Sequence, residues 1–248
     1  MTSILLPRFL CLLVSYAFGC FLTAEVVCRK LTGKPCKELG TSGNPGMANI
    51  MAHLGFKPGI TVLFGDIMKT VLAIVVCILL FSGDETGHPV VNLISIGSSS
   101  LLGDTVLFTK ESAVSAPGLG IIAAYYAALG TTLGHNYPFW QRFHGGKGVA
   151  TGCTGITLVN PLWGIISMLA GMCVTFATQY LSVGAFTIPL FFAIPSWIVL
   201  GPEAGIISIV MALLSFIKNW PQFKLIPSGQ AERVDVRGAI KKKWFHKK

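Results

Sequence analysis

Long apolar runs separated by short polar segments are the feature of this sequence that most restricts its fold. Hydrophobic residues make up 52% of the 248-residue chain and charged residues only 12%, against about 25% charged residues in a typical soluble domain. A helix that crosses a bilayer needs roughly 20 mostly apolar residues. We therefore expect an all-α integral membrane protein with about seven transmembrane helices, over residues 4–27, 60–81, 119–133, 149–160, 162–178, 183–200 and 204–217, the fourth being short.

Lysine and arginine gather in three of the segments between the runs, and this sets the expected orientation. Residues 28–59 hold five of them, residues 134–148 hold two and residues 218–248 hold nine. Residues 82–118 hold one, beside four acidic residues. Because short basic loops stay in the cytoplasm, we expect seven crossings with the N-terminus outside and the C-terminus in the cytoplasm.

This arrangement divides the chain into a multi-span membrane domain, residues 1–217, and a basic cytoplasmic tail, residues 218–248. The first run is too long for the apolar part of a signal peptide, so we expect it to stay in the protein. Residues 90–108, which are rich in serine and glycine, predict a re-entrant or surface-lying piece rather than a span. The end of the tail is typical either of contact with anionic lipid or of a solvated terminus.

Composition also argues against several classes of function. The formal net charge of +9 does not indicate nucleic-acid binding, because the basic residues lie in short segments between apolar runs. Five of the seven cysteines lie in apolar stretches, and no C-x-x-C pattern occurs. Neither a disulfide framework nor a metal site is therefore expected.

Residues 40–49, Gly-Thr-Ser-Gly-Asn-Pro-Gly-Met-Ala-Asn, form a first candidate binding loop on the side expected to be cytoplasmic. Gly43 and Gly46 let the backbone come close to a ligand, and the serine and asparagine side chains offer hydroxyl and amide groups. Such a loop can turn its N–H groups toward an anion. The alternative is a turn with a helix cap.

Residues 134–151, Gly-His-Asn-Tyr-Pro-Phe-Trp-Gln-Arg-Phe-His-Gly-Gly-Lys-Gly-Val-Ala-Thr, form a second candidate loop. Glycines surround Lys147 immediately before an apolar helix, so backbone N–H groups, a helix N-terminus and a cation converge, as a phosphate group requires. The loop is not a nucleotide P-loop, because Gln141 and Gly148 stand where that pattern needs Gly and Ser or Thr. The alternative is a flexible loop at the membrane interface.

These motifs, with Asp-Ile-Met-Lys at residues 66–69 between them, resemble the bacterial acyl-phosphate:glycerol-3-phosphate acyltransferases, the PlsY family. Their order and spacing agree with the family, apart from the segment over residues 82–118, which is longer than usual. The resemblance covers most of residues 1–220. It implies a seven-helix, multi-pass enzyme of the bacterial inner membrane with its active site on the cytoplasmic side.

The resemblance also implies a reaction. An acyl group passes from acyl phosphate to the 1-hydroxyl of glycerol 3-phosphate, giving lysophosphatidic acid and phosphate in phospholipid biosynthesis. Both substrates and the membrane lipid are the implied partners. The donor is already activated, so no cofactor is implied, neither ATP nor coenzyme A.

The resemblance further assigns roles to residues. His135, Asn136 and Lys147 are expected to be catalytic; Lys147 supplies charge, and His135 is a candidate general base whose alternative is a structural histidine. Asp66 and Lys69, one helical turn apart, are expected to form a structural ion pair, because charges within a span are usually paired. The expected substrate-binding residues are Ser42, Gly43, Asn44, Gly46, Asn49, Gly145, Gly146, Gly148, Ser182 and Asn219.

Two positions depart from the family pattern. Ala52 stands where the family usually has arginine, and Phe216 where it has histidine. Each charge-assisted hydrogen bond contributes roughly 1.5–3 kcal/mol, so the two losses should weaken phosphate binding by several factors of ten. Lys57, Lys218 and Lys224 are candidates for compensation.

Three functions are therefore compared. The first is the acyltransferase, which rests on the two intact motifs. The second is a catalytically weak or inactive paralogue that acts as a binding or regulatory membrane protein. The third is a transporter or channel for a phosphate-bearing solute, which lacks support from repeated halves or from charges deep in the spans.

Overall fold

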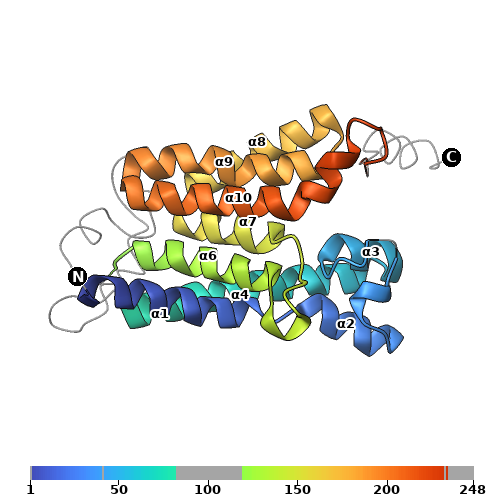
Figure 1. Ribbon diagram of the computed structural model, residues 1–248, viewed down its shortest axis with the longest axis horizontal. Helices are drawn as coiled ribbons and strands as arrows, with labels where there is room; N and C mark the ends of the chain where they lie inside the picture. The colour runs from blue at the N-terminus through green and yellow to red at the C-terminus, as the bar shows by residue number, and fades with distance from the viewer. Residues whose placement is uncertain (1, 41, 82–118, 232, 234–248) are drawn as a thin grey trace.

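The computed structural model describes residues 2–40, 42–81, 119–231 and 233. Every regular element in these residues is a helix, as the sequence predicts (Figure 1). The re-entrant or surface-lying piece expected at residues 90–108, and the end of the tail with its two alternatives, lie outside the described residues. The elements are α1 (Thr2–Gly19), α2 (Thr23–Thr32), η1 (Cys36–Glu38), α3 (Met47–Leu54), α4 (Phe56–Phe81), α6 (Ile122–Asn136), η2 (Phe139–Gln141), α7 (Val149–Val159), α8 (Pro161–Thr178), α9 (Leu181–Leu200) and α10 (Pro202–Leu225).

Several of these helices are long and apolar enough to cross a membrane. Large apolar side chains such as Phe9, Leu80 and Ile198 are 61%, 62% and 76% exposed, as suits a surface that faces hydrocarbon rather than water. The protein is therefore an all-helical, multi-pass membrane protein. Within the described residues, the five candidate spans are Leu5–Thr32, Phe56–Phe81, Pro161–Thr178, Leu181–Leu200 and Pro202–Leu225, and Val149–Val159 is a shorter apolar helix.

The first predicted span is broken into two helices. α1 ends at Gly19, and α2 begins at Thr23. A break in a helix leaves carbonyl groups without their usual partners, and the Lys69 ammonium donates to two of them, Gly19 O at 3.3 Å and Phe21 O at 2.8 Å. The break is thus stabilised by a side chain from α4, which no local pattern in the first run reveals.

The last helix extends past its predicted end. The sequence predicted a span over residues 204–217, but α10 continues to Leu225 and contains Pro221. The first residues assigned to the tail therefore belong to this helix. The prediction stopped at Lys218 because polar residues begin there, whereas the helix projects beyond the apolar region.

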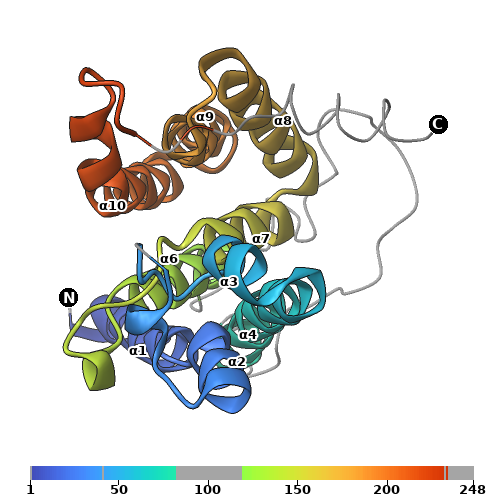
Figure 2. The same ribbon diagram turned by 90° about the vertical axis from the view of Figure 1, so that its right-hand side faces the viewer.

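The helices form two groups with a central layer between them. In Figures 1 and 2, α8, α9 and α10 lie together on one side, α1 and α4 lie on the other, and α6 and α7 run between them. Contacts of α6 with α1 and with α10 connect the layers, and α9 and α10 pack against each other within one outer group. α6 is the central helix, because almost all of its residues are buried.

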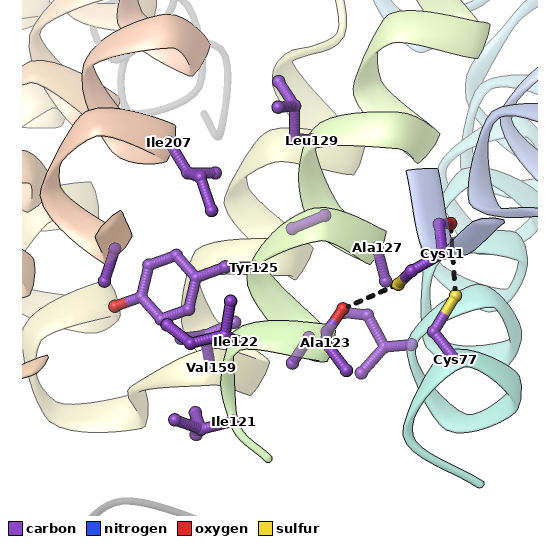
Figure 3. Packing of buried hydrophobic residues seen from close by; sticks show 14 of the residues in the cluster. Cys11, Cys77, Ile121, Ile122, Ala123, Tyr125, Ala127, Leu129, Val159 and Ile207 are labelled. Atoms are coloured by element: carbon purple, nitrogen blue, oxygen red, sulfur yellow. Dashed lines mark hydrogen bonds between the residues drawn. The ribbon is translucent and has the colours of Figure 1, made fainter. Parts of the chain in front are cut away.

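Small residues let α6 pack closely on its neighbours. An added Cβ at Gly130 would meet the Ser15 hydroxyl of α1, and Ala123 and Ala127 are fully buried. Such residues allow helix backbones to approach in a membrane, where no hydrophobic driving force exists between helices. Figure 3 shows Cys11 beside α6, where its thiol donates to Ala123 O at 3.2 Å.

The two ends of the bundle differ in character. At the end near the N-terminus, the Arg8 guanidinium forms a two-fold ion pair with Glu203, at 2.7 and 2.9 Å, and Tyr126 donates to the same carboxylate at 3.0 Å. At the opposite end lie α2, α3 and the loop that follows α6 (Figure 1). Both glycine-containing motifs lie at this second end.

Candidate active site

The loop before α3 is held by its own polar side chains. The Ser42 hydroxyl donates to Asn49 Oδ1 at 3.1 Å, and the Asn49 amide donates to Leu39 O at 3.1 Å. Gly43 has a φ of 56°, and an added Cβ there would lie 2.8 Å from Lys37 O. The loop therefore requires glycine at this position for both conformation and space.

The second loop doubles back on the end of α6. The N–H of Gly145 donates to Asn136 O at 3.1 Å, and the N–H of Gly146 donates to His135 O at 3.0 Å. Gly148, with a φ of 73°, is the N-cap of α7. These bonds place Lys147 between the end of α6 and the start of α7.

A cavity of about 860 Å³ lies between the two loops, at the end of the bundle that faces the viewer in Figure 2. Its size suits a small-molecule ligand. Of the predicted site residues, six line it: Ser42, Gly43, Asn44, Gly145, Gly146 and Lys147. Segments more than 90 residues apart in the sequence thus meet at one cavity.

The cavity is strongly cationic. Lys147 is joined in its wall by four further lysine and arginine residues, Arg29, Lys37, Arg142 and Lys218, whereas Glu25 is the one acidic residue among the described residues that line it. Cations that converge on a partly enclosed site attract phosphate groups. The arrangement therefore indicates an anionic ligand.

Sequence reasoning missed the role of Glu25 and Arg29. Glu25 is only 3% exposed, and its carboxylate accepts from Arg29 Nε at 2.6 Å and from Cys36 N at 2.9 Å. The carboxylate therefore fixes the arginine on α2 and anchors η1. The available signal was an acidic residue within an apolar run, four positions before an arginine.

Two groups outside the spans are harder to ionise than usual, Cys36 in the cavity wall and Tyr137, whose ring contacts the wall residue Lys218. Burial raises the pKa of the Cys36 thiol, with further contributions from Cys28 and Glu25. Burial also raises the pKa of the Tyr137 phenol. Both groups therefore stay neutral at physiological pH and add no negative charge to the cationic cavity.

The segment after α6 forms another wall of the cavity. Trp140 lines it, and its indole N–H donates to Cys20 O at 2.7 Å, at the break between α1 and α2. Arg142 and Phe143 have φ values of 52° and 62°, a left-handed conformation that non-glycine residues seldom adopt. Backbone strain of this kind persists where surrounding contacts enforce it, often at functional sites.

Behind the cavity lies a buried polar cluster. Lys69 Nζ lies 2.9 Å from Asp66 Oδ1, as an ion pair, and 2.8 Å from His135 Nδ1. All three side chains are at most 5% exposed. An added Cβ at Gly146 would overlap His135 Nε2, so the histidine ring lies directly against the second loop.

Several predicted site residues lie away from the cavity wall. His135 and Asn136 are buried behind the second loop, and Gly148 borders a narrower pocket next to Lys147. Ser182 is buried in α9, and Asn219 is buried in α10, where its amide donates to Ser215 O at 2.9 Å. Gly46 and Asn49 belong to the start of α3 and support the first loop.

A multi-pass helical bundle with a cationic, glycine-bounded cavity at one end defines a class of protein: a membrane protein that binds an anionic small molecule. Comparison with known families makes this specific. The model of the family described as glycerol-3-phosphate acyltransferase matches residues 9–229. The chain belongs to this family.

Individual relatives resemble it over most of the chain. Glycerol-3-phosphate acyltransferase 1 of Lactobacillus johnsonii is 29% identical over 238 residues, 96% of this chain and 98% of the relative. The glycerol-3-phosphate acyltransferase of Clostridioides difficile is 30% identical over 173 residues, 69% of this chain and 68% of the relative.

A solved structure has the same fold. The crystal structure of PlsY, an integral membrane glycerol 3-phosphate acyltransferase, in its glycerol 3-phosphate form, superimposes with a TM-score of 0.67 at 22% identity. The match covers 94% of this chain and 98% of that chain. The bundle described above is therefore that of an integral membrane protein of known architecture.

Proposed function

We propose that this protein transfers an acyl group from acyl phosphate to the 1-hydroxyl of glycerol 3-phosphate, forming lysophosphatidic acid and phosphate. The observation that carries the proposal is the cavity in which both glycine loops and Lys147 meet. Both substrates carry a phosphate group, and five basic side chains line this cavity. Family membership supports the acceptor, and the activated donor removes any need for ATP or coenzyme A.

The chemistry needs little beyond alignment and charge. The acceptor hydroxyl oxygen attacks the carbonyl carbon of the donor, the bond from that carbon to the phosphate oxygen breaks, and the hydroxyl proton passes to the departing phosphate. Positioning two reactants and stabilising developing negative charge supply most of the rate enhancement in such reactions. We assign the charge to Lys147 and the positioning to the loops that contain Ser42 and Gly146.

His135 and Asn136 are proposed to position the second loop rather than to transfer protons. Lysine can only donate, so its bond to Nδ1 places the proton of a neutral His135 ring on Nε2, which faces Gly146. Neither side chain lines the cavity, whereas their backbone carbonyls accept from the loop. The departing phosphate is therefore the better proton acceptor.

We further propose that the chain crosses the inner membrane seven times, through α1–α2, α4, α6, α7, α8, α9 and α10. The N-terminus lies outside, and the cavity and the tail lie in the cytoplasm. The basic loops at the cavity end support this orientation. The short α6 and α7 are accommodated because they run between the two outer groups of helices.

The test is phosphate release by the purified protein from palmitoyl phosphate, with and without glycerol 3-phosphate, beside a Lys147→Ala variant. We expect phosphate release to require the acceptor and to fall at least about 100-fold in the variant. A loss of this size is typical when one charge-stabilising donor is removed. No acceptor-dependent release by folded wild-type protein would sink the proposal. It would favour the inactive relative suggested by Ala52 and Phe216.

A further inference from the structure

The two positions at which the family's cations are missing do not face the cavity. Ala52 is exposed on α3, and neither it nor Phe216 is among the residues that line the cavity in the described part of the chain. Phe216 packs into an aromatic cluster, with its ring centroid 5.4 Å from Phe186, 5.3 Å from Trp220 and 5.2 Å from Phe223. A basic group that serves the cavity must come from elsewhere.

Lys218 is on a different face of α10 from Phe216. Two residues along a helix correspond to a rotation of about 200°, which takes Lys218 away from the aromatic cluster. Pro221 and Gln222, one turn further along, line the cavity together with Lys218. The face of α10 that contains Lys218 is therefore the cavity face.

The Lys218 ammonium lies beside the second glycine loop. Its Nζ is 3.5 Å from Gly145 O and 4.2 Å from the centre of the Tyr137 ring. An ammonium has three N–H donors. One long bond to a carbonyl and contact with a ring face leave donor capacity for an anion next to Lys147.

The other two candidate lysines do not reach this place. Lys224 is on the same helix, but its Nζ lies 5.5 Å from the centre of the Trp220 ring, and Lys57 is exposed at the start of α4. Neither is among the described residues that line the cavity. Of the three lysines, Lys218 alone combines a place in the wall with contact to the glycine loop.

We propose that Lys218 is a phosphate-binding residue of this cavity, and that it supplies there a positive charge that residues 52 and 216 do not provide. Its ligand is a substrate phosphate group, either that of glycerol 3-phosphate or that of the acyl donor. Because Lys218 is on α10 and Gly145 follows α6, the bound phosphate also joins the two sides of the cavity. The assignment rests on the proposed function.

The experiment compares Lys218→Met with Lys218→Arg and with the matched control Lys224→Met. The KM for glycerol 3-phosphate and the KM for palmitoyl phosphate are measured separately, which identifies the phosphate that is bound. We expect Lys218→Met to raise one of them about 10- to 100-fold, the range for a charge-assisted hydrogen bond. Lys218→Arg should keep most of the affinity, and Lys224→Met should stay within about twofold of wild type.

A second measurement is independent of turnover. The affinities of wild type and Lys218→Met for glycerol 3-phosphate and for a short-chain acyl phosphate are measured separately by calorimetry. Lys218→Met should bind one of these two ligands about 10- to 100-fold more weakly than wild type does. If wild type binds but does not turn over, the proposed reaction fails while the role of Lys218 is still tested. The proposed role of Lys218 in phosphate binding would be overturned if folded Lys218→Met kept the KM values or the binding affinities of wild type. It would also be overturned if wild type bound neither substrate. If Lys218→Met does not fold, Lys218→Gln is judged by the same criteria.

Discussion

The ammonium of Lys69 on α4 donates to Nδ1 of His135 on α6 over 2.8 Å, and the two residues are 66 positions apart in the sequence. The same ammonium pairs with Asp66 and donates to the carbonyls at the break between α1 and α2. One buried cation therefore connects three parts of the bundle. It fixes the histidine ring that supports the second glycine loop.

Replacing Lys69 with methionine should destabilise the protein strongly. The change leaves the Asp66 carboxylate buried without its partner, and breaking a buried ion pair costs about 3–5 kcal/mol. Thermal unfolding of the detergent-solubilised protein should show a marked fall in midpoint. The double variant Asp66→Asn with Lys69→Met should recover part of the lost stability, since no unpaired charge remains. The control is Lys30→Met, on the exposed part of α2. Equal stability of Lys69→Met and wild type would show that the Asp66–Lys69–His135 cluster does not stabilise the fold.

Replacing Gly146 with alanine should impair activity more than stability. The new Cβ would overlap the His135 ring, so the loop that contains Lys147 must shift, and a displacement near 1 Å can cost about 100-fold in rate. The measurement is kcat/KM for phosphate release.

Gly152→Ala is the matched control for this change. An added Cβ at Gly152 would lie 4.0 Å from both Met211 and Thr132, which is ordinary contact, and alanine favours a helix. We expect wild-type kcat/KM and equal or slightly higher stability. Equal effects of Gly146→Ala and Gly152→Ala on kcat/KM would show that contact with the His135 ring does not determine the activity.

Restoring the family residues with Ala52→Arg and Phe216→His should not raise activity. An arginine at residue 52 starts from an exposed position outside the cavity wall, and a histidine at residue 216 replaces a ring in the aromatic cluster. Each aromatic pair contributes about 0.5–1.5 kcal/mol beyond its buried area, so the unfolding midpoint should fall. A gain of tenfold or more in kcat/KM would show instead that these positions act at the site.

The Arg8–Glu203 pair at the far end should matter modestly for stability and little for catalysis. Both side chains are partly exposed, 23% and 37%, so solvent screens their attraction. A double-mutant cycle with Arg8→Met and Glu203→Gln should give a coupling of about 0.5–1 kcal/mol. The KM for glycerol 3-phosphate should remain unchanged, because the cavity lies at the other end of the bundle. A large rise in this KM would indicate coupling between the two ends.

The sequence by itself determined the class of the protein. Apolar runs of membrane-spanning length have few structural solutions, because backbone groups in hydrocarbon must bond within a helix. The glycine motifs around Asn44 and Lys147 are local patterns, so the family could be predicted from residue order alone, and their binding role stays a prediction.

Only the tertiary structure decided which side chains share the cavity. Arg29, Glu25 and Lys218 lie in separate segments, and no periodicity shows that a residue on α2 and one on α10 face the same space. The break after Gly19 likewise depends on a lysine from another helix. Long-range placement of this kind follows from how the helices pack, since local sequence sets the type of each helix but not its neighbours.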